Sequence, residues 1–282
     1  MVTLLDGRAI AAQVLAEIAV RATTFAAQTG RPPGLATVQA GANAASSWYV
    51  RQIERACRRA NVAFALTTLP ADCAPDAPVR AVAALCSQPD VQGIIVQQPL
   101  PAQVVLADVI AALDPHRDID GLHPLNAGLL AQGRAGAIAP ATPLGGLELL
   151  RRAGLPINGQ HVVIVGRSAV VGRPLALLLL AEHATVTVCH TRTRDLAAIT
   201  RQADILAVAA GRPDLITATM VKPGAAVLDF GINEVAGQVV GDVAADVKAV
   251  AGWLTPVPGG LGPMTNAMLL HNLLDAAERQ LA

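Results

Sequence analysis

Short apolar runs of strand length alternate with longer stretches of helical period along most of this chain. This alternation is typical of α/β proteins with mainly parallel strands, because a crossover helix connects each strand to its parallel neighbour. The pattern predicts strands at Leu35–Gln39, Val62–Leu69, Gly93–Gln97, His161–Val165, Thr185–Cys189, Asp204–Ala209 and Ala226–Phe230. It also predicts an amphipathic helix at Ser46–Arg59, capped by its serines, and a last helix at Met264–Leu281.

A segment rich in Asp, His, Pro and Gly, Asp114–Pro143, separates the first three predicted strands from the last four. The chain has 282 residues, and domains average about 150, so we expect two lobes with this segment at their boundary. The pattern alone leaves open on which lobe the last helix packs.

The composition excludes several classes of partner. The chain has 21 basic and 21 acidic residues and is 53% hydrophobic, so it folds around substantial cores and has no charge surplus for nucleic acid or an anionic membrane. The apolar run Leu175–Ala181 is far shorter than the roughly 18 residues of a membrane span, and Asp6 and Arg8 interrupt the amino terminus. We therefore expect a cytoplasmic protein without a membrane segment. The four cysteines lack the spacing of metal ligands, and no metal site is expected.

The predicted strand His161–Val165 leads directly into a turn with two glycines and then into a leucine-rich helix. A strand, a glycine-bearing turn and a helix in this order leave backbone N–H groups free to bind a pyrophosphate. Ser168 stands where the usual dinucleotide fingerprint has its second glycine, so a plain βα turn is the alternative interpretation. The cofactor-binding candidates here are Gly166, Arg167, Ser168 and Gly172.

The next predicted strand ends at Cys189, and no acidic residue follows until Asp195. NAD-binding units normally have an acidic residue at this strand end, which binds the ribose 2′-hydroxyl. Arg167, Thr191 and Arg192 instead suit a 2′-phosphate, because guanidinium and hydroxyl groups complement phosphate oxygens. The sequence favours NADP over NAD, and a solvated run of surface arginines is the alternative.

Seven segments carry a resemblance to a known family: Ser46–Val50, Val96–Pro101, Asp118–Pro124, Gly166–Pro174, Asp229–Asn233, Gly241–Val243 and Thr255–Thr265. In this order they resemble the bifunctional methylenetetrahydrofolate dehydrogenase/methenyltetrahydrofolate cyclohydrolase family. The resemblance implies an α/β fold with an N-terminal folate lobe, residues 1–140 plus 265–282. It also implies a Rossmann-like dinucleotide lobe with a doubly wound parallel sheet, residues 141–264, a cleft between the lobes and a homodimer. Tetrahydrofolate one-carbon derivatives are the implied substrates.

The resemblance also implies roles for single residues. Tyr49 would stack on the pterin, Gln97 would form a hydrogen bond at the reacting centre, and Asp120 would bind the amino-pyrimidine edge. A core tyrosine, a glutamine bonded to backbone and a turn-capping aspartate are the structural alternatives. His123 is expected to be a structural hydrogen-bonding residue. The further substrate-binding candidates are Gln52, Val96, Gln98, Pro258, Gly259, Gly260 and Gly262, and Ile232 is a further cofactor-binding candidate.

One position departs from the family pattern in a way that bears on catalysis. The family motif Tyr-Val-x-x-Lys carries a catalytic lysine, but this chain has Ile53 at that place, four residues after Tyr49 and on the same helix face. Isoleucine neither carries a proton nor polarises a water molecule, and the chain has no lysine before Lys222. Hydride transfer depends mainly on the cofactor and on alignment, whereas hydrolysis of the methenyl cation needs a positioned acid or base.

We therefore expect an NADP-dependent methylenetetrahydrofolate dehydrogenase, an oxidoreductase of one-carbon metabolism whose hydrolase activity is weak or lost. The catalytic position 53 would then hold an inert side chain. Three alternatives stay open. The first is a still-bifunctional enzyme that uses Gln52 or Gln98 to position water. The second is a non-catalytic paralogue that binds folate and nucleotide, and the third is an enzyme of a specialised one-carbon pathway.

Overall fold

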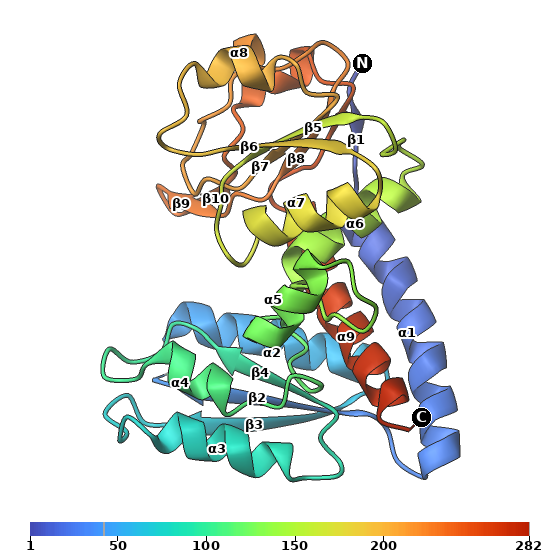
Figure 1. The fold of residues 1–282 in the computed structure, drawn as a ribbon, viewed down its shortest axis with the longest axis vertical. Coiled ribbons are helices and arrows are strands. Elements are labelled where there is room, and N and C mark those ends of the chain that lie inside the picture. Colours follow the sequence, from blue (N-terminus) through green and yellow to red (C-terminus); the bar gives the residue numbers. More distant parts are fainter. Residues whose placement is uncertain (42, 282) are drawn as a thin grey trace. The chain divides into compact units, whose positions relative to one another are not determined.

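The computed structural model describes residues 1–41 and 43–281. The chain divides into two units, whose elements are labelled in Figure 1. The three-stranded unit contains Ala12–Ala141 and Asn266–Ala282, and the six-stranded unit contains Met1–Ala11 and Thr142–Thr265. This division differs from the predicted one in the first eleven residues, because β1 (Thr3–Leu4) pairs with β11 (Trp253–Leu254) and so joins the other sheet.

In the three-stranded unit, β2 (Gly34–Ala40) lies between β3 (Ala63–Leu69) and β4 (Gly93–Gln97), and both pairings are parallel. All seven residues of β2 are buried, as expected of a central strand in a parallel sheet that is covered on both faces. One face carries Val38 and Ile94 into a core cluster with residues of α3 (Ala77–Cys86) and α4 (Leu106–Ala111). The predicted strands agree with these to within one residue.

The other face of this sheet packs against α9 (Leu261–Arg279), since a Cβ atom added at Gly93 would lie 2.6 Å from Leu273 Cδ1. The remaining helices that the unit contains or shares are α1 (Gly7–Thr29), α2 (Ala44–Arg59), α5 (Pro124–Ala131) and α6 (Ala141–Arg152). The cap of α2 corrects our prediction, because Asn43 rather than a serine is the N-cap. Asn43 Oδ1 accepts from the N–H of Ser46 at 2.8 Å, and Ser46 Oγ accepts from the N–H of Asn43 at 3.1 Å.

Helix α1 is a long apolar helix near the amino terminus. Its 23 residues include a window with a mean hydropathy of 1.3, enough by length and composition to cross a membrane, although core helices of soluble proteins meet the same criterion. Val14, Ile18 and Phe25 are buried along one stripe, and Arg21 forms an ion pair with Asp275 of α9 at 2.7 Å. A single buried stripe and a charged anchor are typical of a helix that packs against protein.

In the sheet of the six-stranded unit, all neighbouring strands are parallel, in the order β1-β11-β8-β7-β5-β6. The sheet is doubly wound as predicted. β6 (Thr185–Cys189) lies on one side of β5 (His161–Val165) and β7 (Ile205–Val208) on the other. The unit also contains β8 (Ala226–Asp229), the helices α7 (Gly172–Ala181) and α8 (Leu196–Thr200), and the 3₁₀ turns η1 (Ala218–Met220) and η2 (Ala245–Ala249). A hairpin of β9 (Asn233–Val235) and β10 (Gln238–Val240) was not predicted.

Asn272 of α9 fixes the segment that carries Asp120. Its Nδ2 donates to the carbonyls of Ile119 and Ala139, both at 2.9 Å, and the residue is buried. A buried carbonyl that loses its donor costs roughly 1–3 kcal/mol. We therefore expect Asn272→Leu to lower the free energy of unfolding by this amount in urea denaturation.

The matched control is Gln280→Leu. Gln280, which follows α9, also donates to two carbonyls, those of Gln92 at 3.0 Å and His116 at 3.4 Å, but its side chain is exposed. Water can replace these contacts, so the control should change stability little. Equal losses in the two variants would contradict the role given to burial.

Candidate active site

The candidate residues of the three-stranded unit lie at the carboxyl ends of its strands. Gln97 is the last residue of β4, and Tyr49 lies near the start of α2, which follows β2. Because β3 and β4 lie on opposite sides of β2, the strand order reverses here, and open parallel sheets bind ligands at such a point. Burial and the charge of Asp120 both raise the pKa of the Tyr49 phenol, which places these two side chains near each other.

Asp120 has an unusual electrostatic environment. Burial raises its pKa to about 7, and the negative charge of Asp118 adds to the rise. Asp118 accepts hydrogen bonds from the N–H groups of Leu122 at 3.0 Å and His123 at 2.7 Å, and from the Asn126 amide at 2.9 Å. Among the described residues, no basic group lowers the pKa of Asp120. The site therefore holds a carboxyl group without a compensating cation.

The buried face of α2 is apolar at position 53. Ile53 is 1% exposed and therefore does not face solvent, whereas Arg51 is exposed. One turn further on, Cys57 is also buried, and this burial raises the pKa of its thiol to about 12. Neither Ile53 nor Cys57 supplies a charged group at neutral pH.

Two polar side chains on the α9-facing side of the sheet have unused hydrogen-bonding atoms. Gln97 is 8% exposed, and its Nε2 donates to the carbonyl of Gln98 at 2.6 Å, which leaves Oε1 buried without a partner among the described residues. The hydroxyl of Thr37 in β2 is likewise buried and unpartnered, and Thr37 pairs with Ile95, two residues before Gln97 on the same face. Buried polar atoms normally have partners, so both are open to a ligand or water. Sequence reasoning missed Thr37, because its place in an apolar run gives no signal.

The remaining predicted substrate residues have different surroundings. Val96 packs into the core cluster with α3 and α4, so its side chain lies on the face opposite to Gln97, while Gln52 is half-buried and Gln98 exposed. The four residues Pro258, Gly259, Gly260 and Gly262 belong to the six-stranded unit. Within residues 1–41 and 43–281, no group of three or more His, Cys, Asp or Glu side chains is placed to hold a metal ion.

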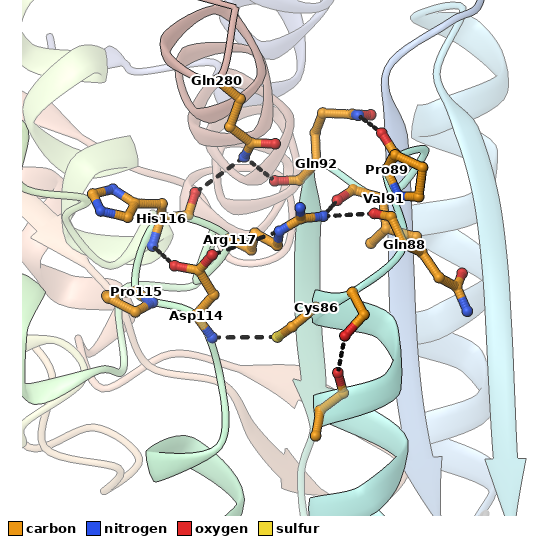
Figure 2. Close-up of polar contacts among 12 residues, drawn as sticks. Cys86, Gln88, Pro89, Val91, Gln92, Asp114, Pro115, His116, Arg117 and Gln280 are labelled. Atoms are coloured by element: carbon orange, nitrogen blue, oxygen red, sulfur yellow. Dashed lines mark hydrogen bonds and ion pairs between the residues drawn. The ribbon is translucent and has the colours of Figure 1, made fainter.

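Polar contacts anchor the segment before Asp118, as Figure 2 shows. Arg117 donates to the carbonyls of Gln88, at 2.9 Å, and of Val91, and forms an ion pair with Asp114 at 3.7 Å. The predicted structural role of His123 is confirmed, since its Nδ1 caps α5 by accepting from the N–H two residues later at 3.1 Å. These contacts hold the chain on both sides of Asp120.

In the six-stranded unit, the turn after β5 has the predicted order of strand, turn and helix. A Cβ atom at Gly166, where φ is +133°, would lie 2.2 Å from the carbonyl oxygen of Ala209, and one at Gly172 would lie 2.1 Å from the Gly166 carbonyl oxygen. Both positions therefore require glycine. Ser168 Oγ accepts from the N–H of Val171 at 3.1 Å and from that of Gly172 at 3.4 Å, so this hydroxyl satisfies the start of α7.

The predicted phosphate-binding residues lie in two loops: Arg167 in the turn after β5, and Thr191 and Arg192 in the loop after β6. All three are exposed. Asp195, the first acidic residue after β6, is the N-cap of α8, and its Oδ1 accepts from the N–H three residues later at 3.1 Å. Ile232, after β8, is 73% exposed. The loops after β5 and β6 thus carry exposed arginines, and the nearest acidic residue, Asp195, is bound to the start of α8.

The pKa of Asp120 makes its effect on stability testable. Because the folded chain holds this proton more tightly than the unfolded chain, stability is highest below the ordinary carboxyl pKa of 3.8 and falls as the pH rises to about 7. Asp120→Asn removes the buried charge and should raise the free energy of unfolding at pH 8 by on the order of 2 kcal/mol, with little change at pH 4. Urea denaturation at the two pH values measures this, and a uniform change at both would contradict it.

Comparisons with known proteins agree with this arrangement. Family models match residues 5–120, as the catalytic domain of tetrahydrofolate dehydrogenase/cyclohydrolase, and residues 140–281, as its NAD(P)-binding domain. The chain is 52% identical over 277 residues to "Bifunctional protein FolD" of Herpetosiphon aurantiacus, covering 98% of this chain and 96% of the relative. The corresponding protein of Chloroflexus aurantiacus is 51% identical over 280 residues, covering 99% and 98%.

Solved structures of dehydrogenase/cyclohydrolase enzymes are also similar to this chain. A bifunctional FolD dehydrogenase/cyclohydrolase from Campylobacter jejuni has a TM-score of 0.97 and 38% identity, over 99% of this chain and all of that one. A Trypanosoma brucei dehydrogenase-cyclohydrolase complexed with NADP and an inhibitor has a TM-score of 0.94 and 38% identity, over 99% and 98%. This chain therefore belongs to the tetrahydrofolate dehydrogenase/cyclohydrolase family.

Proposed function

We propose that this enzyme oxidises 5,10-methylenetetrahydrofolate to 5,10-methenyltetrahydrofolate with NADP, and that its cyclohydrolase activity is weak or lost. One observation carries the second half of the proposal: a fully buried Ile53 stands at the family's lysine position. The raised pKa of Asp120 is in line with it, because burial and the charge of Asp118 raise this pKa and no cation lowers it.

Three residues of the three-stranded unit would bind the folate. Tyr49 offers a flat ring beside Asp120, and ionised Asp120 accepts hydrogen bonds from the amino-pyrimidine edge. The unpartnered Oε1 of Gln97 accepts a further hydrogen bond near the one-carbon unit. Together these contacts orient the substrate, which is what hydride transfer requires of the protein.

The six-stranded unit would hold the dinucleotide. The close approaches at Gly166 and Gly172 allow the tight turn that a pyrophosphate needs, and Arg167 and Arg192 extend into solvent beside it. When bound, NADP supplies the hydride acceptor. The residues of the chain thus fit a dinucleotide.

Hydrolysis of the methenyl product needs an acid or base beside the substrate, and these residues do not supply one. A positioned acid or base contributes about 10²–10⁴-fold to such a step. The Tyr49 phenol and the Cys57 thiol have pKa values raised by burial, so neither is a base at neutral pH, and Arg51 is exposed. Asp120 is engaged by the substrate.

A still-bifunctional enzyme is the second candidate, favoured by the names of relatives at 50% identity or more. It would need Gln52 or Gln98 to position the water. A non-catalytic binding protein or a specialised one-carbon enzyme is distinguished by the same assay. The homodimer and the cytoplasmic location stay predictions.

The decisive assay incubates the protein with methylenetetrahydrofolate and NADP and follows the reduced cofactor, methenyl and 10-formyl products together. We expect reduced cofactor and methenyl product with little formyl product. Ile53→Lys should raise formyl production by about 10²-fold, because it restores an ammonium group one helical turn from Tyr49.

The matched control for this variant is Ile53→Met, which changes the side chain without adding charge and should not restore hydrolysis. Wild-type hydrolysis as fast as hydride transfer, with no gain in Ile53→Lys, would show that the enzyme is bifunctional. Absence of all three products would indicate a binding protein.

The preference for NADP rests on exposed arginines and on an Asp195 already committed to the α8 cap. We expect Arg167→Ala and Arg192→Ala each to raise the KM for NADP about tenfold, since hydrogen bonds between charged groups are lost, and to change the KM for NAD little. Arg201→Ala, an exposed arginine that donates to the Thr219 carbonyl, is the control. Equal losses with both cofactors would refute the 2′-phosphate assignment.

A further inference from the structure

Asp242 is a fully buried carboxylate to which the predicted site gives no role. Its Oδ2 accepts from the N–H groups of Ala210 at 2.6 Å and Gly211 at 2.9 Å, and its Oδ1 accepts from the N–H of Arg212 at 2.9 Å. Three successive backbone N–H groups therefore converge on one side chain. Charge-assisted hydrogen bonds of this kind are stronger than neutral ones, so they hold this stretch of backbone firmly.

The backbone that Asp242 holds lies at the point where the six-stranded sheet reverses its order. Residues 210–212 follow β7, which lies beside β5, while β6 lies on the other side of β5. Ala209 connects β7 to this loop: its N–H donates to the Val165 carbonyl at 2.8 Å, and its own carbonyl oxygen packs against Gly166. The loop thus follows directly on the residue that packs against the Gly166 turn.

Asp242 is itself held in place by two neighbours. Asn233 Nδ2 donates to its Oδ1 at 2.8 Å, and the N–H of Asp242 donates to Asp229 Oδ1 at 2.9 Å. Four donors therefore surround the two oxygens of the Asp242 carboxylate. An amide at this position would turn an NH₂ group toward backbone N–H groups, which cannot accept its hydrogen bonds.

We propose that Asp242 is a positioning residue for the dinucleotide: it fixes the backbone of residues 210–212 and so shapes the cofactor edge beside the Gly166 turn. With no exposed surface, Asp242 acts through this backbone and does not touch the ligand. The proposal rests on the proposed function, since it requires a dinucleotide at this edge. A merely structural Asp242 would affect stability without any selective effect on dinucleotide affinity.

The test is calorimetric titration of the full-length protein with NADP and, separately, with tetrahydrofolate. Asp242→Asn should raise the Kd for NADP about tenfold or more and leave the Kd for tetrahydrofolate unchanged. Two control variants should leave both constants unchanged. Asp246→Asn removes a surface carboxylate that accepts from the N–H of Ala218 at 3.2 Å, and Val247→Ala weakens the core of the same unit.

Each outcome decides between the interpretations. An Asp242→Asn protein that melts earlier but binds NADP as tightly as wild type overturns the proposal, as does an equal loss of NADP affinity in Val247→Ala. Should Asp242→Asn not fold, Gly211→Ala strains the same loop at a φ of +63° and has to show the selective loss. A wild-type protein that binds no NADP refutes the proposed function itself.

Discussion

The reversal of strand order beside one strand of each parallel sheet determines where this chain can bind ligands. In a parallel sheet all carboxyl ends lie at one edge, and connections that leave in opposite directions open a crevice there. β2 has β3 and β4 on its two sides, and β5 has β6 and β7. Tyr49 and Gln97 lie at the first of these points, and the Gly166 turn lies at the second.

The electrostatics of the three-stranded unit depend on what faces Asp120. A buried carboxyl group beside another acid is costly to ionise unless a cation or donors compensate it. Asp118 has three donors of its own, whereas the pKa of Asp120 is raised and α2 contributes Ile53 to the interior. The free site is thus less stable when Asp120 is ionised, and the donors of a bound pterin would offset that cost.

The sequence predicted those features that local patterns encode. Strands such as Gly93–Gln97 were placed correctly because apolar runs end at glycines and polar residues. The pairing of β1 with β11 was missed, since a two-residue strand has no periodicity and its partner is some 250 residues away. The β9–β10 hairpin gives only a weak sequence signal, because Gly237 is the one turn-type residue between its strands, and Ala236 has a positive φ that its residue type does not indicate. The roles of Asp242 and Thr37 were invisible, because they depend on contacts or pairing between distant segments.

The hydroxyl of Ser168 has a consequence for how a nucleotide would be held. By accepting from the first N–H groups of α7, it reduces the number of backbone donors left for a pyrophosphate. More of the attraction then has to come from long, solvent-exposed guanidinium side chains, whose field is screened within about 10 Å at 0.1 M ionic strength. Nucleotide affinity in this protein would accordingly be sensitive to added salt.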